Sequence, residues 1–99
     1  MVKIVWTELS TLDLKEIFDY IAENSHRYAI ITANKIYEKV QVIAANPFSG
    51  RIIDKFNENS IRELIEGNYR IIYRIKSEMQ VDILRVYHSA RLLNKNKIN

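Results

Sequence analysis

The chain has no cysteine, one proline and two glycines among its 99 residues. Without cysteine it can have neither a disulfide framework nor a thiolate zinc site nor a thiol nucleophile. The scarcity of glycine and proline argues against a loop-rich β-sandwich and against long flexible linkers. Long apolar runs are also lacking, so the sequence predicts neither a signal peptide nor a membrane-spanning segment. We therefore expect a cytoplasmic protein with no membrane partner.

Hydrophobic residues make up 47% of the chain, which is enough for a packed core. The length suits a single domain, which we expect to span residues 1–93 and to be followed by a polar, frayed tail at 94–99. The net charge of +3 is modest, but the positive excess lies in the second half of the chain. That placement favours a polyanion or an acidic protein as partner.

Apolar periodicity indicates two helices between strands. Residues 2–6 form a β-branched run typical of a strand. The next segment has an apolar helical face, with Thr7 or Ser10 as its start: Leu14, Ile17, Phe18 and Ile21. A second apolar stripe covers residues 29–43, and Pro47 ends that helix because the residue before proline is pushed out of the helical region.

Three strand candidates follow, at residues 61–65, 69–76 and 81–87, and the links between them are short. Short links require antiparallel neighbours. The sequence therefore predicts an α+β domain of βααβββ order that begins with a strand. Its antiparallel helical hairpin should pack on one face of a small, mainly antiparallel sheet, because two helices cannot cover both faces.

The strand at 69–76 alternates apolar and basic residues. Residues 69, 71, 73 and 75 should face the helices, which places Arg70, Ile72, Arg74 and Lys76 on the uncovered face. Arg62 and Arg85 join that face if the register allows, and few glutamates are available to neutralise them. Such a surface suits RNA or an acidic peptide, since guanidinium groups both pair and stack. Alternatively, the arginines are only the polar side of a half-exposed sheet.

The segment "VYHSARLL" at residues 86–93 carries the candidate acid–base groups. His88 could move protons near neutral pH, or its ring could bond a backbone carbonyl at the end of the strand. Tyr87 is a stacking platform, an acid or a core residue, and Arg91 could hold a phosphate or a carboxylate. Both faces of this last strand are partly apolar, so its orientation stays open.

Four motifs carry a resemblance to a known family: "DLKEIFDYIAENS", "NPFSGR", "IRELIEGNYRIIYRI" and "VDILRVYHSARLL". In this order and spacing, from Trp6 to about Leu93, the chain resembles the RelE/ParE superfamily of bacterial type II toxins. The resemblance implies the βααβββ order. It also implies a cognate antitoxin whose C-terminal segment wraps the toxin and whose N-terminal part binds operator DNA, which this chain would reach only through the antitoxin.

Two mechanisms exist within that superfamily. RelE-like members cleave messenger RNA on the ribosome, without metal or cofactor, and the resemblance then implies Arg62, Tyr87 and His88 as catalytic residues. ParE-like members poison DNA gyrase, and the arginines would instead bind the target: Arg51, Arg70, Arg74, Arg85 and Arg91.

The last strand, "ILRVYHSARLL", is more similar to that of ParE-like proteins. The stretch "RIIDKFNENSIREL" lacks the dense lysine and arginine set of RelE-like enzymes, with only Arg51, Lys55 and Arg62. We therefore expect a ParE-like toxin, associated with plasmid stabilization, and keep two alternatives. One is the RelE-like endoribonuclease. The other is an inactive relative that serves as a nucleic-acid or peptide-binding module.

Overall fold

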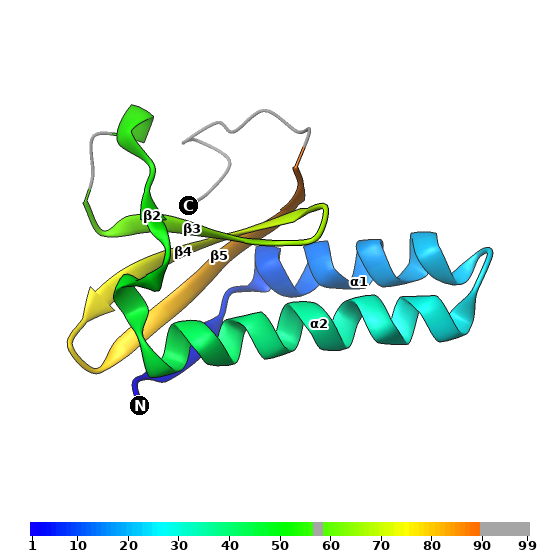
Figure 1. The fold of residues 1–99 in the computed structure, drawn as a ribbon, viewed down its shortest axis with the longest axis horizontal. Helices are drawn as coiled ribbons and strands as arrows, with labels where there is room; N and C mark the ends of the chain where they lie inside the picture. Colours follow the sequence, from blue (N-terminus) through cyan, green and yellow to red (C-terminus); the bar gives the residue numbers. More distant parts are fainter. Residues whose placement is uncertain (57–58, 90–99) are drawn as a thin grey trace.

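A computed structural model describes residues 1–56 and 59–89 (Figure 1). The elements in chain order are β1 (Lys3–Trp6), α1 (Glu8–Ala22), α2 (His26–Ala45), the 3-10 turn η1 (Pro47–Ser49), β2 (Arg51–Ile52), the 3-10 turn η2 (Asp54–Phe56), β3 (Ile61–Glu66), β4 (Tyr69–Ser77) and β5 (Gln80–His88). The tail predicted at residues 94–99 lies outside the described residues. In the described part of the chain, no helix is both long enough and apolar enough to cross a bilayer.

Side-chain caps set where the helices begin. Thr7 Oγ1 accepts a hydrogen bond from the Ser10 backbone N–H at 3.2 Å, so α1 starts at the earlier of the two predicted positions. Ser25 Oγ caps α2 in the same way, by accepting from the Tyr28 N–H at 3.1 Å. The second helix ends at Ala45 with Asn46 as its C-cap, directly before Pro47, as predicted.

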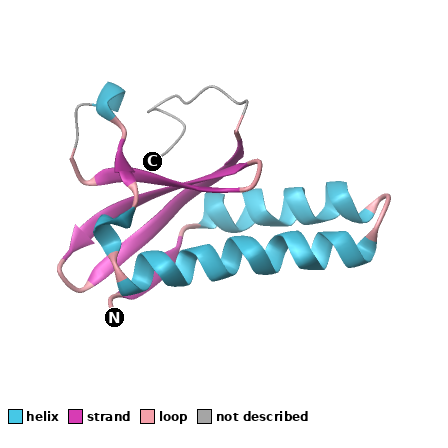
Figure 2. Ribbon diagram, in the orientation of Figure 1, coloured by secondary structure: helices cyan, strands magenta, loops and turns pink. Residues whose placement is uncertain are grey.

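The five strands form one open sheet in the order β1-β5-β4-β3-β2. Neighbouring strands are antiparallel except β1, which runs parallel to β5 with Ile4 opposite Val81. Both helices lie on the same face of the sheet (Figures 1 and 2). The predicted α+β fold with a one-sided helical hairpin is confirmed. The two-residue edge strand β2 was not predicted, because its surroundings in the sequence are polar.

The main core lies between the hairpin and the sheet. It joins α2 to β4 and β5 through Ile36, Val40, Ile43, Ile71, Tyr73, Val81, Ile83 and Val86, each at most 2% exposed. Phe18 and Ile21 of α1 are only partly buried, although their helical spacing predicts a buried face. The far end of the hairpin, where these residues lie, extends beyond the sheet (Figure 1).

The sheet face away from the helices is not bare, which corrects the expectation of an uncovered cationic surface. It carries a second buried apolar cluster: Ile53, Phe56, Ile61, Ile72, Leu84 and Tyr87. Ile53 and Phe56 come from the segment after β2 that the sequence presents as a polar connection. The chain around η2 thus folds over this face and buries the apolar side chains between the arginines.

A bulge in β5 decides the orientation of the last strand. Tyr73 pairs with Ile83 and Ile72 pairs with Arg85, so Leu84 is an extra residue between the two pairs. After the bulge, Arg85 shares the face of Ile72, away from the helices, because opposed residues in antiparallel strands point to the same side. Both apolar stripes of β5 are therefore used, one in each core.

Candidate functional site

Arg70 and Arg74 lie on the sheet face opposite the helices, as the alternation of β4 predicts. Arg74 is opposite Ile61 of the second cluster, and Arg70 is opposite Ile65. Their environment differs from the prediction, because an acidic side chain on the same face pairs with one of them. That side chain is Glu63, which register places beside Ile72.

Glu63 is a buried carboxylate held between two arginines. Its side chain is 2% exposed. Arg51 donates from Nε to Oε1 at 2.9 Å, and Arg70 donates from Nη2 to Oε2 at 2.6 Å. Buried carboxylates are tolerated when they are paired and hydrogen-bonded in this way. The Arg70 side chain is only 18% exposed, whereas that of Arg51 is 77% exposed and extends into solvent.

Arg85 is also held by a carboxylate. It donates from Nε and Nη2 to the two oxygens of Asp13 in α1, at 2.7 and 2.8 Å, and its guanidinium lies 4.7 Å from the centre of the Tyr87 ring. The hydrogen bond to Asp13 raises the pKa of Arg85, so its charge is permanent. The prediction places Arg85 among solvated cations; in the structure its side chain is only 14% exposed.

Arg62 does not join the other arginines. Its register partner is Tyr73, so it lies on the helix side of the sheet, and its predicted place beside Arg70 and Arg74 is wrong. Its Nη1 donates to the backbone oxygens of Gly50 at 3.0 Å and Phe48 at 3.4 Å. The guanidinium lies 5.0 Å from the centre of the Phe48 ring.

Tyr87 and His88 lie on opposite faces of β5. Tyr87 is 3% exposed and belongs to the second cluster. Of the three roles predicted for it, its position in the fold is that of a core residue. His88 pairs with Tyr69 across the strands, and the two rings pack edge to face with their centres 5.8 Å apart. The side chain of His88 is exposed on the helix side.

The three candidate catalytic residues therefore do not converge. Arg62 is opposite Tyr73, and His88 is opposite Tyr69, four residues along the same strand. Four residues of strand span about 13 Å, and Tyr87 is on the other face of the sheet. Arg91, which is predicted to bind the target, lies outside the described residues. Within the described residues no three histidine or acidic side chains are grouped so that they could hold a metal ion.

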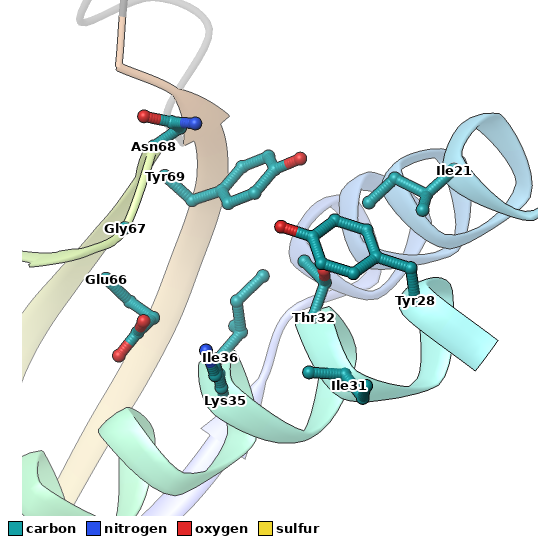
Figure 3. Close-up of a pocket in the computed structure, with 10 residues that line it drawn as sticks. All are labelled: Ile21, Tyr28, Ile31, Thr32, Lys35, Ile36, Glu66, Gly67, Asn68 and Tyr69. Atoms are coloured by element: carbon teal, nitrogen blue, oxygen red, sulfur yellow. The ribbon is translucent and has the colours of Figure 1, made fainter. Parts of the chain in front are cut away.

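The sequence does not predict a pair of cavities that meet at Tyr69. One of about 180 Å³ lies between α2 and the β3–β4 turn, with Tyr28 and Tyr69 pointing toward each other across it (Figure 3). The other, about 280 Å³, is bordered by Tyr20, Glu16 and His88 and shares Tyr69. Burial raises the pKa of Tyr69, and the neighbouring phenols of Tyr28 and Tyr20 raise it further. We call these two cavities the Tyr69 groove.

Comparison with known proteins decides the family. A family model described as "ParE toxin of type II toxin-antitoxin system, parDE" matches residues 4–93. The chain belongs to the ParE toxin family. The predicted RelE/ParE resemblance, closer to ParE-like members, is thereby confirmed.

Solved structures agree with this membership. The chain is similar to one from the chromosomal ParDE TA system of P. aeruginosa, with 25% identity, a TM-score of 0.71, and 89% of this chain and 96% of the other covered. It also has the fold of a chain in the toxin–antitoxin complex RelBE2 from Mycobacterium tuberculosis. There the identity is 21%, the TM-score 0.62, and the coverage 88% and 96%. Among the curated proteins, none matches.

Proposed function

We propose that this ParE-family chain is the toxin of a type II toxin–antitoxin pair and blocks bacterial growth by poisoning DNA gyrase. The observation that carries the proposal is the ParE family match over residues 4–93. It is supported by the similarity, at 25% identity, to a chain of a ParDE system.

The separation of Arg62, Tyr87 and His88 favours gyrase over messenger RNA as the target. Cleavage of RNA at a ribose 2′-OH requires a base, an acid and a charge-stabilising cation around one phosphate. Here the cation candidate lies about 13 Å from the histidine along the strand, and the tyrosine is buried on the other face. A gyrase poison needs a contact surface and no such convergence.

The arginines then serve two purposes in the proposal. Arg51 extends into solvent at the edge of the sheet and contacts the target, together with Arg74 and Arg91. Arg70 and Arg85 border the same face but are oriented by Glu63 and Asp13, which holds their guanidinium groups in fixed positions. A guanidinium that is already fixed loses less conformational entropy when a target binds.

For the antitoxin we propose the Tyr69 groove as the docking site. Tyr20 and Tyr28 beside it are 75% and 59% exposed, and exposed apolar surface of this kind marks interaction sites. The similar chains come from a ParDE system and from a toxin–antitoxin complex. An apolar segment of the antitoxin would fill the cavities at Tyr69, and operator DNA would be bound by the antitoxin alone.

Controlled expression in a bacterial host tests the toxin proposal. We expect filamentation with DNA-damage signalling, and inhibition of supercoiling when the purified chain is mixed with gyrase. His88→Ala should inhibit as strongly as the unchanged chain, because no proton transfer is involved. Rapid arrest of translation with cleaved messages, abolished by His88→Ala, would instead identify an endoribonuclease. A chain without toxicity would identify an inactive relative.

Co-expression tests the antitoxin proposal separately. A short reading frame adjacent to the gene should restore growth when it is expressed with the toxin. Tyr28→Arg places a charge in the groove and should weaken this rescue while the toxicity remains. Equal rescue of Tyr28→Arg and the unchanged toxin would place the antitoxin elsewhere.

A further inference from the structure

The turn between α2 and β2 presents an aromatic ring to solvent. Phe48, at the middle of η1, is 67% exposed. Burial of a phenylalanine side chain stabilises a fold, and most of that stabilisation is forgone here. Single exposed apolar residues are common on protein surfaces, so exposure alone assigns no role. The support beneath this ring is what distinguishes it.

The backbone of the turn is fixed from below by Tyr73. The Tyr73 hydroxyl donates to the Pro47 carbonyl at 2.7 Å and accepts from the Gly50 N–H at 2.9 Å, and its side chain is fully buried. Asn46 Oδ1 accepts from the Phe48 N–H at 3.2 Å. The backbone on both sides of Phe48 is therefore held by hydrogen bonds, and the ring projects from a rigid support.

One face of the ring is backed by a cation. The Arg62 guanidinium lies 5.0 Å from the ring centre and is anchored by the carbonyls of Phe48 and Gly50. Arg62 forms no ion pair with any carboxylate of residues 1–56 and 59–89, so its charge is not neutralised there. Arg51 adds a second exposed cation three residues after Phe48, on the edge strand.

We propose that Phe48, backed by Arg62, is a stacking platform for an unpaired nucleobase, with Arg51 contacting the phosphate backbone beside it. A rigid aromatic ring flanked by cations is the arrangement by which proteins bind single-stranded nucleic acid without sequence preference. An acidic protein surface would complement the charge of Arg51 and Arg62, but its carboxylates would not stack on the exposed face of the Phe48 ring. The inference rests on the proposed function: the stacked base belongs to the opened DNA of the gyrase complex.

Binding of a fluorescein-labelled DNA single strand of about 15 nucleotides to the purified chain tests the platform without gyrase. Phe48→Ala should weaken binding about five- to hundredfold, with an unchanged salt dependence, since stacking on one base carries that much affinity. Phe48→Trp should retain it. Arg51→Ala should lower the slope of log K against log salt by about 0.7, the value for one phosphate contact to a single strand. Met79→Ala, at a similarly exposed apolar residue of the β4–β5 turn, is the control and should bind as the unchanged chain does.

A 2-aminopurine base placed in the strand separates stacking from mere proximity. Its fluorescence should be quenched when the unchanged chain binds, and this quenching should be absent with Phe48→Ala and with Phe48→Leu. Full binding by Phe48→Leu, or no binding by the unchanged chain, would overturn the inference. The inference would also be overturned if Phe48→Ala lost binding to gyrase but kept its binding to the DNA strand, because Phe48 would then be a protein contact. A chain that binds DNA through Phe48 but leaves gyrase active would refute the proposed function and leave the platform standing.

Discussion

Asp13 and Arg85 form a two-bond ion pair that ties helix α1 to strand β5, 72 residues away in the sequence. The pair stands just beyond the end of β1, whose last residue Trp6 is opposite Ile83. There β5 has lost its neighbouring strand, and the Asp13 carboxylate accepts the Val86 N–H at 3.0 Å in place of a strand carbonyl. One side chain thus neutralises a cation and satisfies the backbone at an open sheet edge.

We expect Asp13→Ala to lower the free energy of unfolding by about 3–5 kcal/mol, because it removes the carboxylate to which both the Arg85 guanidinium and the buried Val86 N–H donate. Chemical denaturation monitored by circular dichroism measures this. Asp19→Ala, at an exposed carboxylate of the same helix, is the matched control and should change stability by less than about 1 kcal/mol. Equal effects of the two substitutions would show that the Asp13 pair contributes nothing.

A second prediction concerns Glu63. Glu63→Gln keeps the size of the side chain but removes the charge that holds Arg51 and Arg70. We expect a loss of about 3 kcal/mol in the free energy of unfolding, because the largely buried Arg70 guanidinium loses the carboxylate with which it is paired. Glu78→Gln, at an exposed residue in the β4–β5 turn, should be nearly neutral. A neutral Glu63→Gln would mean that the arginines do not need the carboxylate.

The close approach of Gly50 to Tyr73 gives a third prediction. A Cβ at position 50 would lie 2.4 Å from the Tyr73 hydroxyl oxygen and 2.7 Å from the Glu63 carbonyl oxygen. Gly50→Ala should therefore destabilise the protein by about 1–3 kcal/mol through overpacking. Gly67→Asn is the comparison: position 67 has φ of 58° and open space, and asparagine tolerates that conformation. Thermal unfolding of both variants should show a drop in Tm for Gly50→Ala alone.

Tyr73 also predicts how stability depends on pH. Burial raises the pKa of the Tyr73 phenol above its ordinary value of 10.0, so the folded state keeps the proton to higher pH than the unfolded state. The stabilising contribution is complete below pH 10 and is lost as pH rises above 10 toward the folded-state pKa. Tyr73→Phe should show a shallower decline in this range when denaturation is repeated at about pH 9, 10 and 11. Identical slopes in the two proteins would exclude Tyr73 as the cause.

The order of elements and the one-sided helical packing followed from the sequence because apolar periodicity specifies both the type of element and its buried face. The alternation in β4 likewise placed Arg70 and Arg74 away from the helices. Periodicity does not report on partners from distant segments, however. The pairing of Glu63 with Arg70 and the cover supplied by Ile53 and Phe56 depend on how a polar-looking connection folds back over the sheet.

The candidate site shows the same division. The sequence by itself determined the family, through motifs spread over most of the chain, and it singled out the arginines and His88 as chemically notable. Only the tertiary structure decided where they point. Strand register put Arg62 on the helix side, and the bulge at Leu84 put Arg85 on the face opposite that of Ile83. Register and bulges are set by contacts between strands, which no pattern within a single strand specifies.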